Sequence, residues 1–217
     1  MSEFANSAYQ IEAIYHTAAV APKMLKLSQK INSIEISSAI IEKISGLKTA
    51  ADVVAAVRIP QWPALVYDIL NKKFSIVLDG IQDPGNMGTI IRTADWFGIE
   101  NIICSDDCVE VYNPKVVQAT MGSLSRVNVH YVDLEKILTD TKLPVYGALL
   151  DGENIYNTNF GDEGLIVMGN EGKGLTDKVK QLVTRAITIP RGGKAESLNV
   201  AIATAIFCSE INRNKLK

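Results

Sequence analysis

The residues with the clearest chemical potential lie in two polar, glycine-rich segments near the carboxyl end of the chain. An apolar run, Leu165–Met168, is followed by GNEGKG at 169–174. A second apolar run, Ala186–Ile189, leads through another glycine-rich segment to Ser197 and Asn199. Two strand ends that carry such loops on one side of a sheet form a ligand crevice. The two segments therefore predict a binding site.

A third polar segment follows the apolar run Phe74–Leu78. It reads DGIQDPGNMG at 79–88 and contains a proline-glycine turn, with a helix predicted to begin near Asn86–Gly88. Arg92 lies about one turn inside that helix, where it could add a bidentate grip on a phosphate held at the helix N-terminus. The alternative is an ordinary strand–turn–helix joint, with Asn86 as the N-cap and Arg92 solvated. The spacing alone favours this alternative.

The glycine-rich loops do not match the common nucleotide-binding fingerprints. Gly193-Lys194 is followed by Ala195, so the Ser or Thr of a P-loop is absent, and the glycine spacing does not fit a dinucleotide fingerprint. The remaining functional interpretation is that main-chain groups of these loops bind a flat, adenine-like ligand. The alternatives are structural: Glu171 could cap the next helix, and Ser197 could cap the last one.

These segments must be positioned by regular elements, and the chain predicts two parts. Residues 1–70 form a small first unit, and VRIPQWP at 57–63 is extended chain near a boundary between Gln61 and Lys73. From Phe74 onward, short apolar runs alternate with helical stretches, which predicts an α/β domain with a parallel sheet and helices on both faces. The first unit has a strand or short helix at Gln10–Ala18 and helices at Pro22–Leu27, Ser38–Ile44 and Thr49–Ala56. The predicted strands of the second part are Phe74–Leu78, Asn101–Cys104, Val127–Val132, Val145–Leu150, Leu165–Met168 and Ala186–Ile189. Its predicted helices are Gly88–Phe97, Lys115–Leu124, Leu134–Thr139, Thr176–Val183 and Leu198–Arg213.

Composition excludes several classes of protein. The 217 residues are 47% hydrophobic with a net charge of −2, which fits a globular chain without an overall basic surface. The only histidines, His16 and His130, and the sparse cysteines, Cys104, Cys108 and Cys208, predict neither a metal centre nor a histidine triad. No apolar run approaches the roughly 20 residues of a membrane span. We expect a cytoplasmic protein with reduced thiols and no membrane segment.

Taken together and in this order, the three motifs resemble those of the SpoU-type (TrmH-like) RNA ribose 2′-O-methyltransferases of the SPOUT class. The motifs are N-x-G-x-x-x-R-T-A from Asn86, MGNEGKG from Met168 and IP-x5-ESLNV from Ile189. The resemblance covers residues 74–217, for which it implies the catalytic domain with a C-terminal trefoil knot. Residues 1–73 are similar to a shortened form of the small RNA-binding domain that often precedes it.

The resemblance implies transfer of a methyl group from S-adenosylmethionine to a ribose 2′-hydroxyl of structured RNA, with ribosomal RNA favoured over transfer RNA. Enzymes of this kind assign activation of the hydroxyl to the motif-one arginine, here Arg92. Because a guanidinium stays protonated, we expect Arg92 to hold the target phosphate and stabilise negative charge. The resemblance also implies a homodimer and no metal. The catalytic residues it implies are Arg92, Asn86, Glu171, Ser197 and Asn199, and the cofactor-binding residues are Ala148, Leu149, Gly169, Asn170, Gly174, Ile189 and Leu198.

Two alternatives stay open. A non-catalytic RNA- or nucleotide-binding module could use the same fold, although the chain retains every polar motif residue. A knotted methyltransferase that acts on a base is disfavoured by the ribose-type motifs. Arg191 departs from the apolar residue that usually follows Ile-Pro in the family, and its cation could contact cofactor or RNA.

Overall fold

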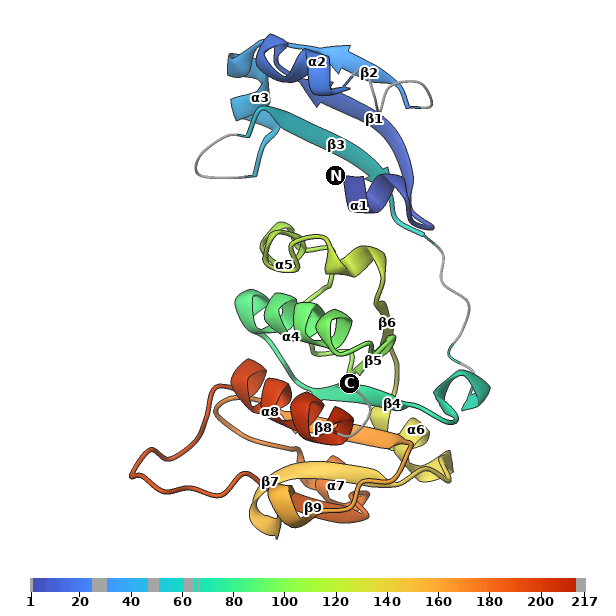
Figure 1. Cartoon of the computed structure of the whole chain (residues 1–217), viewed down its shortest axis with the longest axis vertical. Helices are drawn as coiled ribbons and strands as arrows, with labels where there is room; N and C mark the ends of the chain where they lie inside the picture. Colours follow the sequence, from blue (N-terminus) through green and yellow to red (C-terminus); the bar gives the residue numbers. More distant parts are fainter. Residues whose placement is uncertain (1, 25–30, 47–50, 61–64, 66, 214–217) are drawn as a thin grey trace. The chain divides into compact units, whose positions relative to one another are not determined.

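The computed structural model describes the chain except for residues 1, 25–30, 47–50, 61–64, 66 and 214–217. It divides into two compact units, Met1–Pro63 and Ala64–Lys217 (Figure 1). Among the described residues, no helix has both the length and the apolar character needed to cross a membrane.

A three-stranded sheet is the framework of the first unit, in the order β2 (Ser33–Glu35), β1 (Gln10–His16), β3 (Val53–Arg58). Strand β1 runs parallel to β2 and antiparallel to β3. Ile14 of β1 and Ile41 of α3 are fully buried and form the centre of this small core. The helical segments are α1 (Ser2–Ala5), η1 (Ala18–Val20), α2 (Ala21–Met24) and α3 (Ser38–Ile44).

The predicted helix at Thr49–Ala56 is wrong. Residues 53–56 belong to strand β3, which pairs with β1 so that Val54 lies opposite Tyr15. The alanines of this segment favour a helix, but its β-branched valines fit a pleated surface, and pairing with β1 outweighs the local propensity. Residues 49 and 50 lie outside the described part of the chain, as do the last three residues of the helix predicted at Pro22–Leu27.

The second unit confirms the predicted α/β fold with a parallel sheet. Six strands lie in the order β6-β5-β4-β8-β7-β9, and every neighbouring pair is parallel. All six residues of β4 are buried, as expected for a central strand covered on both faces. The strands are β4 (Phe74–Asp79), β5 (Asn101–Cys104), β6 (Asn128–Tyr131), β7 (Val145–Asn154), β8 (Gly164–Gly169) and β9 (Arg185–Thr188).

Helices cover both faces of this sheet, and each face has its own apolar contacts. On one face, side chains of α6 and α7 pack with strand residues such as Val77 and Val167 in one buried cluster. On the other face, α4 and α8 lie side by side, with α5 next to α4 (Figure 1). The helical segments are η2 (Tyr67–Leu70), α4 (Pro84–Trp96), α5 (Pro114–Ala119), η3 (Ser123–Ser125), α6 (Leu134–Asp140), η4 (Ile155–Asn157), α7 (Asp177–Gln181) and α8 (Val200–Asn212).

Two helix starts differ from the prediction, and both matter for the site. Helix α4 begins at Pro84, and the side chain of Asp83 caps it by accepting from the Asn86 N–H at 2.8 Å. Proline suits the first helical position because its missing N–H would have no partner there. Helix α8 begins at Val200 rather than at Leu198, and Asn199 is its N-cap. The two N-caps lie at the same end of the unit as the loops that follow β4 and β8.

Candidate active site

The order of the strands reverses beside β4. From β4 the chain proceeds outward to β5 and β6, whereas β8 lies on the other side of β4. Such a reversal is the usual position of a ligand site in a parallel sheet, and here hydrogen bonds join the loops that follow β4 and β8. The register places Asp79 beside Gly169, so the polar segment after β4 and the loop 169–174 begin at the same level.

Three motif side chains meet at this end of the sheet in one hydrogen-bonded chain. The Asn86 amide donates through Nδ2 to Glu171 Oε1 at 2.6 Å. The Asn199 amide donates through Nδ2 to Asn86 Oδ1 at 2.9 Å. The three residues come from the start of α4, the loop after β8 and the start of α8. The fold thus brings together side chains that the sequence separates by more than a hundred positions.

Other residues cap helices α4 and α7, so the side chains of Asn86 and Glu171 can bond to each other. Because Asp83 caps α4, the Asn86 side chain is not needed as a cap, and the interpretation of Asn86 as N-cap is wrong. Thr176 caps α7, so Glu171 has no capping role. Asn199 serves two functions, since its Oδ1 accepts from the first backbone N–H groups of α8 while its Nδ2 reaches Asn86.

The loop at 169–174 is held in shape by Asn170. Its backbone N–H and C=O pair with the C=O and N–H of Gly174 at 3.0 and 2.9 Å. Its side-chain Oδ1 accepts from the N–H groups of Gly172 and Lys173, and its Nδ2 donates to the Gly80 carbonyl at 2.7 Å. Glu171 is therefore presented from a tight, internally bonded turn.

Gly169 is required by the close approach of the loop to itself. A Cβ atom at this position would lie 2.4 Å from the carbonyl carbon of Gly174, well inside van der Waals contact. Gly174 adopts a left-handed conformation, with φ of +69°, that glycine tolerates best. Beyond the loop, the buried Asp79 carboxylate accepts from the Thr176 N–H at 2.7 Å and fixes the start of α7.

The predicted cofactor-binding residues Ala148, Leu149, Gly169 and Ile189 lie on or directly after three neighbouring strands, the first two in the middle of β7. Ala148 and Leu149 are on β7, Gly169 ends β8, and Ile189 directly follows β9; all four are half-buried. Strand β7 lies between the other two. Leu198 is 48% exposed beside the cap of α8. Asn170 and Gly174 were also predicted to bind the cofactor. In the structure their backbone N–H and C=O groups bond to each other, so these two residues shape the loop.

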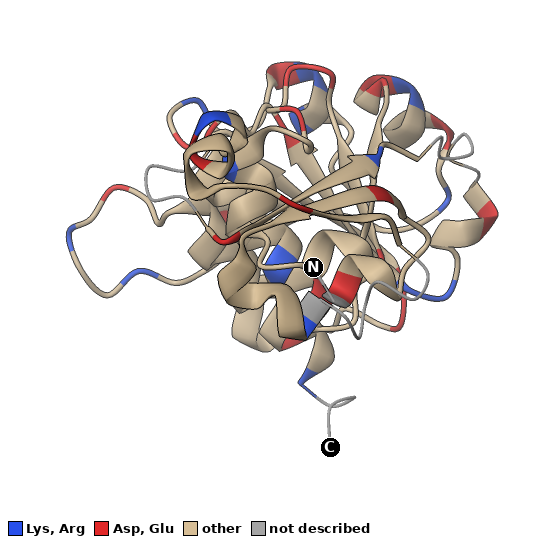
Figure 2. Cartoon of the chain, turned by 90° about the horizontal axis from the view of Figure 1, so that it is seen from above, with Lys and Arg blue, Asp and Glu red and all other residues tan. Residues whose placement is uncertain are grey.

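Arg92 and Ser197 occupy more open positions. Arg92 is exposed on α4, and no hydrogen bond among the described residues joins either side chain to the chain formed by Asn199, Asn86 and Glu171. Ser197 lies on an exposed arm, residues 190–199, between β9 and α8, and it does not cap α8 (Figure 2). On this arm Arg191 donates to the Ala195 carbonyl at 3.0 Å.

Sequence reasoning missed several residues that build the site. Asp83 and Pro84 carry a recognisable signal, because an aspartate followed by proline is typical of an N-cap and first helical position. Asp79 and Thr176 carry no such signal, since their contact joins the ends of two elements far apart in sequence. Within the described residues, no group of three or more His, Cys, Asp and Glu side chains is placed to hold a metal ion.

Comparison with known proteins gives consistent results. The model of the SpoU rRNA Methylase family matches residues 73–209. The sequence is similar to the 23S rRNA (guanosine(2553)-2′-O)-methyltransferase RlmP of Bacillus subtilis, with 33% identity over 136 residues. The matched region is 61% of this chain and 55% of that protein, so the chain aligns with little more than half of that relative's length.

Two solved structures extend the similarity to nearly the whole chain. An RNA methyltransferase assigned to the TrmH family from Porphyromonas gingivalis is 37% identical, with a TM-score of 0.85 over 98% of this chain and 86% of that one. An AdoMet-bound rRNA methyltransferase from Sinorhizobium meliloti is 26% identical, with a TM-score of 0.84 over 97% of this chain and 82% of that one.

Proposed function

The chain belongs to the SpoU rRNA methylase family, and we propose that it transfers a methyl group from S-adenosylmethionine to a ribose 2′-hydroxyl of structured RNA, with ribosomal RNA favoured over transfer RNA. The observation that carries the proposal is the hydrogen-bonded chain of Asn199, Asn86 and Glu171, which joins the three motifs at one place. The 2′-O-methyltransferase name of the similar Bacillus subtilis protein supports the reaction. The AdoMet bound to the similar Sinorhizobium meliloti protein supports the cofactor.

The residues in the middle of β7 and at the ends of β8 and β9 fit this cofactor. Ala148, Leu149, Gly169 and Ile189 offer small or apolar side chains and main-chain groups in a half-buried setting, which suits a flat adenine ring. Leu198 would add apolar surface from the arm, and Asn170 and Gly174 would keep the loop closed. Bound there, S-adenosylmethionine supplies an electrophilic methyl group.

Arg92 would act on the RNA rather than on the cofactor. A ribose 2′-hydroxyl is a poor nucleophile, so the site must align it and stabilise the negative charge that develops on its oxygen. The exposed guanidinium of Arg92 can bind a phosphate with two parallel hydrogen bonds. Asn86, Glu171 and Asn199 would orient the ribose, and the Ser197 hydroxyl would contribute from the arm.

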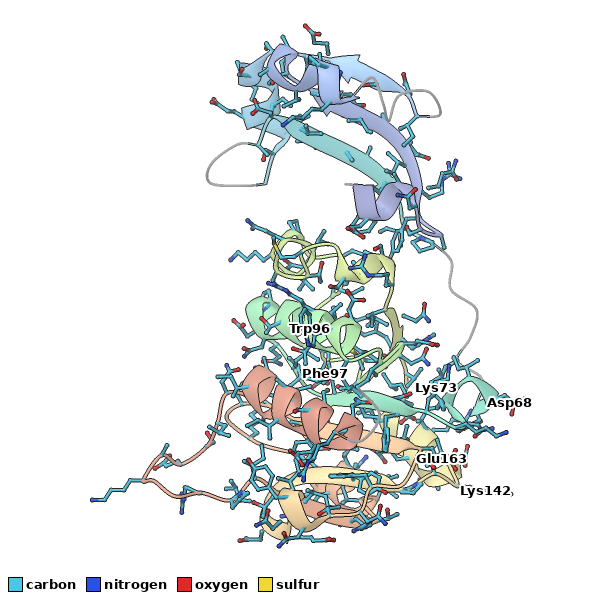
Figure 3. The ribbon with its side chains drawn as sticks, in the orientation of Figure 1. Asp68, Lys73, Trp96, Phe97, Lys142 and Glu163 are labelled. Carbon is cyan, nitrogen blue, oxygen red and sulfur yellow. The ribbon has the colours of Figure 1, made fainter. Side chains whose placement is uncertain are left out.

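A homodimer would complete this site. Helix α4 carries Trp96, which is 81% exposed (Figure 3), and its neighbour α8 carries Ile202, which is 55% exposed. Large exposed apolar side chains on two neighbouring helices favour contact with a second copy of the same chain. Arg92 lies on the same face as Trp96, one helical turn earlier, so a two-fold dimer through this face would place Arg92 at the interface, and the motif resemblance supports its action on the partner's site.

Three further features belong to the proposal. The motif resemblance supports a trefoil knot in the segment from β7 to α8. It also supports an RNA-binding role for residues 1–70, as part of a small substrate-binding domain. The three cysteines of the chain are buried and free, which supports a cytoplasmic location because disulfides are rare there.

The decisive experiment is methyl transfer from radiolabelled S-adenosylmethionine to ribosomal and transfer RNA. Digestion of the RNA to nucleosides should yield labelled 2′-O-methyl nucleosides from ribosomal RNA. Arg92→Ala should abolish the transfer, whereas Lys142→Ala, which removes an exposed cation just before β7, should not (Figure 3). RNA binding without transfer by the wild type would instead support a binding module. Label on a base would refute the ribose assignment.

A further inference from the structure

We propose that Ser105 and Asp107 are positioning residues that hold the turn after β4 and, through it, the loop that presents Glu171. Both residues lie in the loop that follows β5, outside the three motifs. The inference deepens the proposed methyl transfer and rests on it. In this inference, the loop after β5 helps to align Glu171 for the reaction.

The first contact is made to the backbone of Gly80. Ser105 Oγ accepts from the Gly80 N–H at 2.9 Å and donates its own proton to Asp107 Oδ1 at 2.5 Å. Gly80 has a left-handed φ of +72°, and a Cβ atom there would lie 3.2 Å from Asp107 Oδ2. The serine hydroxyl is thus fixed between a backbone donor and a carboxylate, and the turn is enclosed by the aspartate.

The same loop holds the next residue of the turn. Cys108 Sγ accepts from the Ile81 N–H at 3.2 Å, and the Val109 N–H donates to the Ile81 carbonyl at 2.8 Å. Hydrogen bonds, the largest from Cys104, lower the pKa of the Cys108 thiol to about 7, and the bond from the Ile81 N–H is one of them. Two successive backbone N–H groups after β4 are therefore held by side chains of one neighbouring loop.

The turn passes this constraint to the loop at 169–174. The Gly80 carbonyl accepts from Asn170 Nδ2 at 2.7 Å, and Asn170 Oδ1 in turn accepts from the N–H groups of Gly172 and Lys173. Glu171 lies between these bonded residues. A continuous series of hydrogen bonds thus runs from Asp107 through Ser105, Gly80 and Asn170 to the backbone on either side of Glu171.

The series lies beyond the ends of the strands, so its loss should affect alignment more than folding. The ladder between β4 and β8 ends at Asp79 and Gly169 and does not depend on Ser105. Asp107 is exposed and Ser105 is half-buried, so neither contributes much to the apolar core. A small displacement of aligned groups can slow a reaction greatly without unfolding the protein.

The test compares four full-length variants: Ser105→Ala, Ser105→Thr, Asp107→Ala and the control Asp106→Ala, which removes a neighbouring exposed carboxylate. Ser105→Ala should lower kcat about tenfold while KM for RNA changes less than about twofold, since alignment rather than RNA binding is lost. Asp107→Ala should show a smaller fall in kcat. Ser105→Thr, which keeps the hydroxyl, should restore kcat, and Asp106→Ala should match the wild type.

A second measurement separates this inference from the proposed function. Hydrogen–deuterium exchange at residues 80–81 and 169–174 should accelerate in Ser105→Ala and return to wild-type rates in Ser105→Thr. If the wild type transfers no methyl group, the proposed function fails, but exchange still decides whether the series holds the loop. Unchanged exchange at 169–174 in Ser105→Ala, or a kcat loss that Ser105→Thr does not restore, would overturn the inference.

Discussion

At the residue scale, the site depends on one amide, that of Asn86, which both donates and accepts a hydrogen bond. Asn86 accepts a hydrogen bond from Asn199 and donates one to the Glu171 carboxylate. A carboxylate can only accept and an ammonium can only donate, so the side chain between Asn199 Nδ2 and the Glu171 carboxylate must do both. The amide of Asn86 at the start of α4 meets this requirement.

Replacing this amide tests its role directly. Asn86→Asp should place a second carboxylate against Glu171, where the present contact is 2.6 Å, and the two charges should repel. Because acidic residues are favoured in the first turn of a helix, the fold should tolerate the change. Methyl transfer should fall by about a hundredfold, equivalent to roughly 2.7 kcal/mol in the barrier, with little change in Tm.

A matched control makes the same chemical change nearby. Gln82→Glu converts an exposed amide to a carboxylate in the segment before α4. It should retain wild-type activity in the same transfer assay. Equal losses in both variants would mean that negative charge at this end of the sheet, rather than the Asn86 contacts, matters to the reaction.

Gly169 provides a second test at this scale. Gly169→Ala would place a methyl group 2.4 Å from the carbonyl carbon of Gly174. This clash should displace the loop at 169–174. Overpacking of this kind costs about 1–3 kcal/mol. Calorimetric titration should show at least about tenfold weaker binding of S-adenosylmethionine, because the loop end is displaced.

The comparison variant for this test is Gly172→Ala, at the same loop. An added Cβ there would meet only Asn170 Oδ1, at 3.7 Å, which is ordinary contact. Its affinity for the cofactor and its Tm should stay close to those of the wild type. If Gly169→Ala also binds like the wild type, the close approach to Gly174 does not control the cofactor site.

The sequence indicated candidate residues but not what they touch. Asn86, Glu171 and Asn199 were selected because the three motifs together resemble those of a known family, and their role in the reaction stays a prediction. Their mutual contacts depend on how the loops after β4 and β8 pack against the start of α8. No local sequence pattern encodes this packing. The relation of Ser105 to Gly80 is hidden for the same reason, since a serine after a strand is common in any loop.

At the element scale, an ion pair joins α4 to the segment after η3. Arg126 donates to both carboxylate oxygens of Asp95, at 2.9 and 2.7 Å. The hydrogen bond from Arg126 is the largest cause of the lowered pKa of Asp95. A carboxylate with a lowered pKa stabilises the fold above its unfolded pKa, and this contribution is lost as the pH falls through the folded value.

Arg126→Met should therefore destabilise the protein in a pH-dependent way. At pH 7 the loss should be about 0.5–1 kcal/mol, because the pair is bidentate but partly exposed to solvent. The difference from the wild type should shrink as the pH falls below the usual range of an aspartate. Urea unfolding at several pH values measures it. Lys178→Met, which breaks a more exposed pair with Glu135, should have a smaller effect.

Helices and strands were predictable where burial, rather than the local propensity of the residues, determines the secondary structure. The continuous apolar runs of β4, β5 and β8 predicted buried parallel strands, and Asn101–Cys104 was placed with its observed bounds. The error at β3 arose where the strand is half-buried, so that alanines and valines give no clear period. The start of α4 was predicted four residues too late, where Asn86 was interpreted as the cap in place of Asp83. The start of α8 was predicted two residues too early, where Ser197 was interpreted as the cap in place of Asn199.

At the scale of the whole molecule, the order of the strands was not predictable from their pattern. The run of alternating elements indicates a parallel sheet but not that β8 inserts between β4 and β7. That insertion sets Asp79 beside Gly169, at the end of the sheet where the motif side chains meet. Contacts between segments far apart in the chain decide this order, and no local sequence pattern encodes those contacts.

The proposed dimer makes a prediction about assembly. Trp96→Lys combined with Ile202→Lys should place two charges on the exposed surfaces of α4 and α8 and prevent association. Light scattering after size-exclusion chromatography should then give the mass of one chain, against two for the wild type. Tyr156→Lys, an exposed aromatic on η4, should remain dimeric. A monomeric wild type would refute the dimer.

The dimer also predicts that two inactive variants can complement each other. Arg92→Ala and Glu171→Gln should each be inactive alone. If Arg92 acts on the partner's site, a mixed dimer has one site that carries both substitutions and one that carries neither. Co-expression of equal amounts, with separate tags, should then restore about a quarter of wild-type transfer. If Arg92 acts on the site of its own chain, both sites of the mixed dimer are damaged and no activity returns.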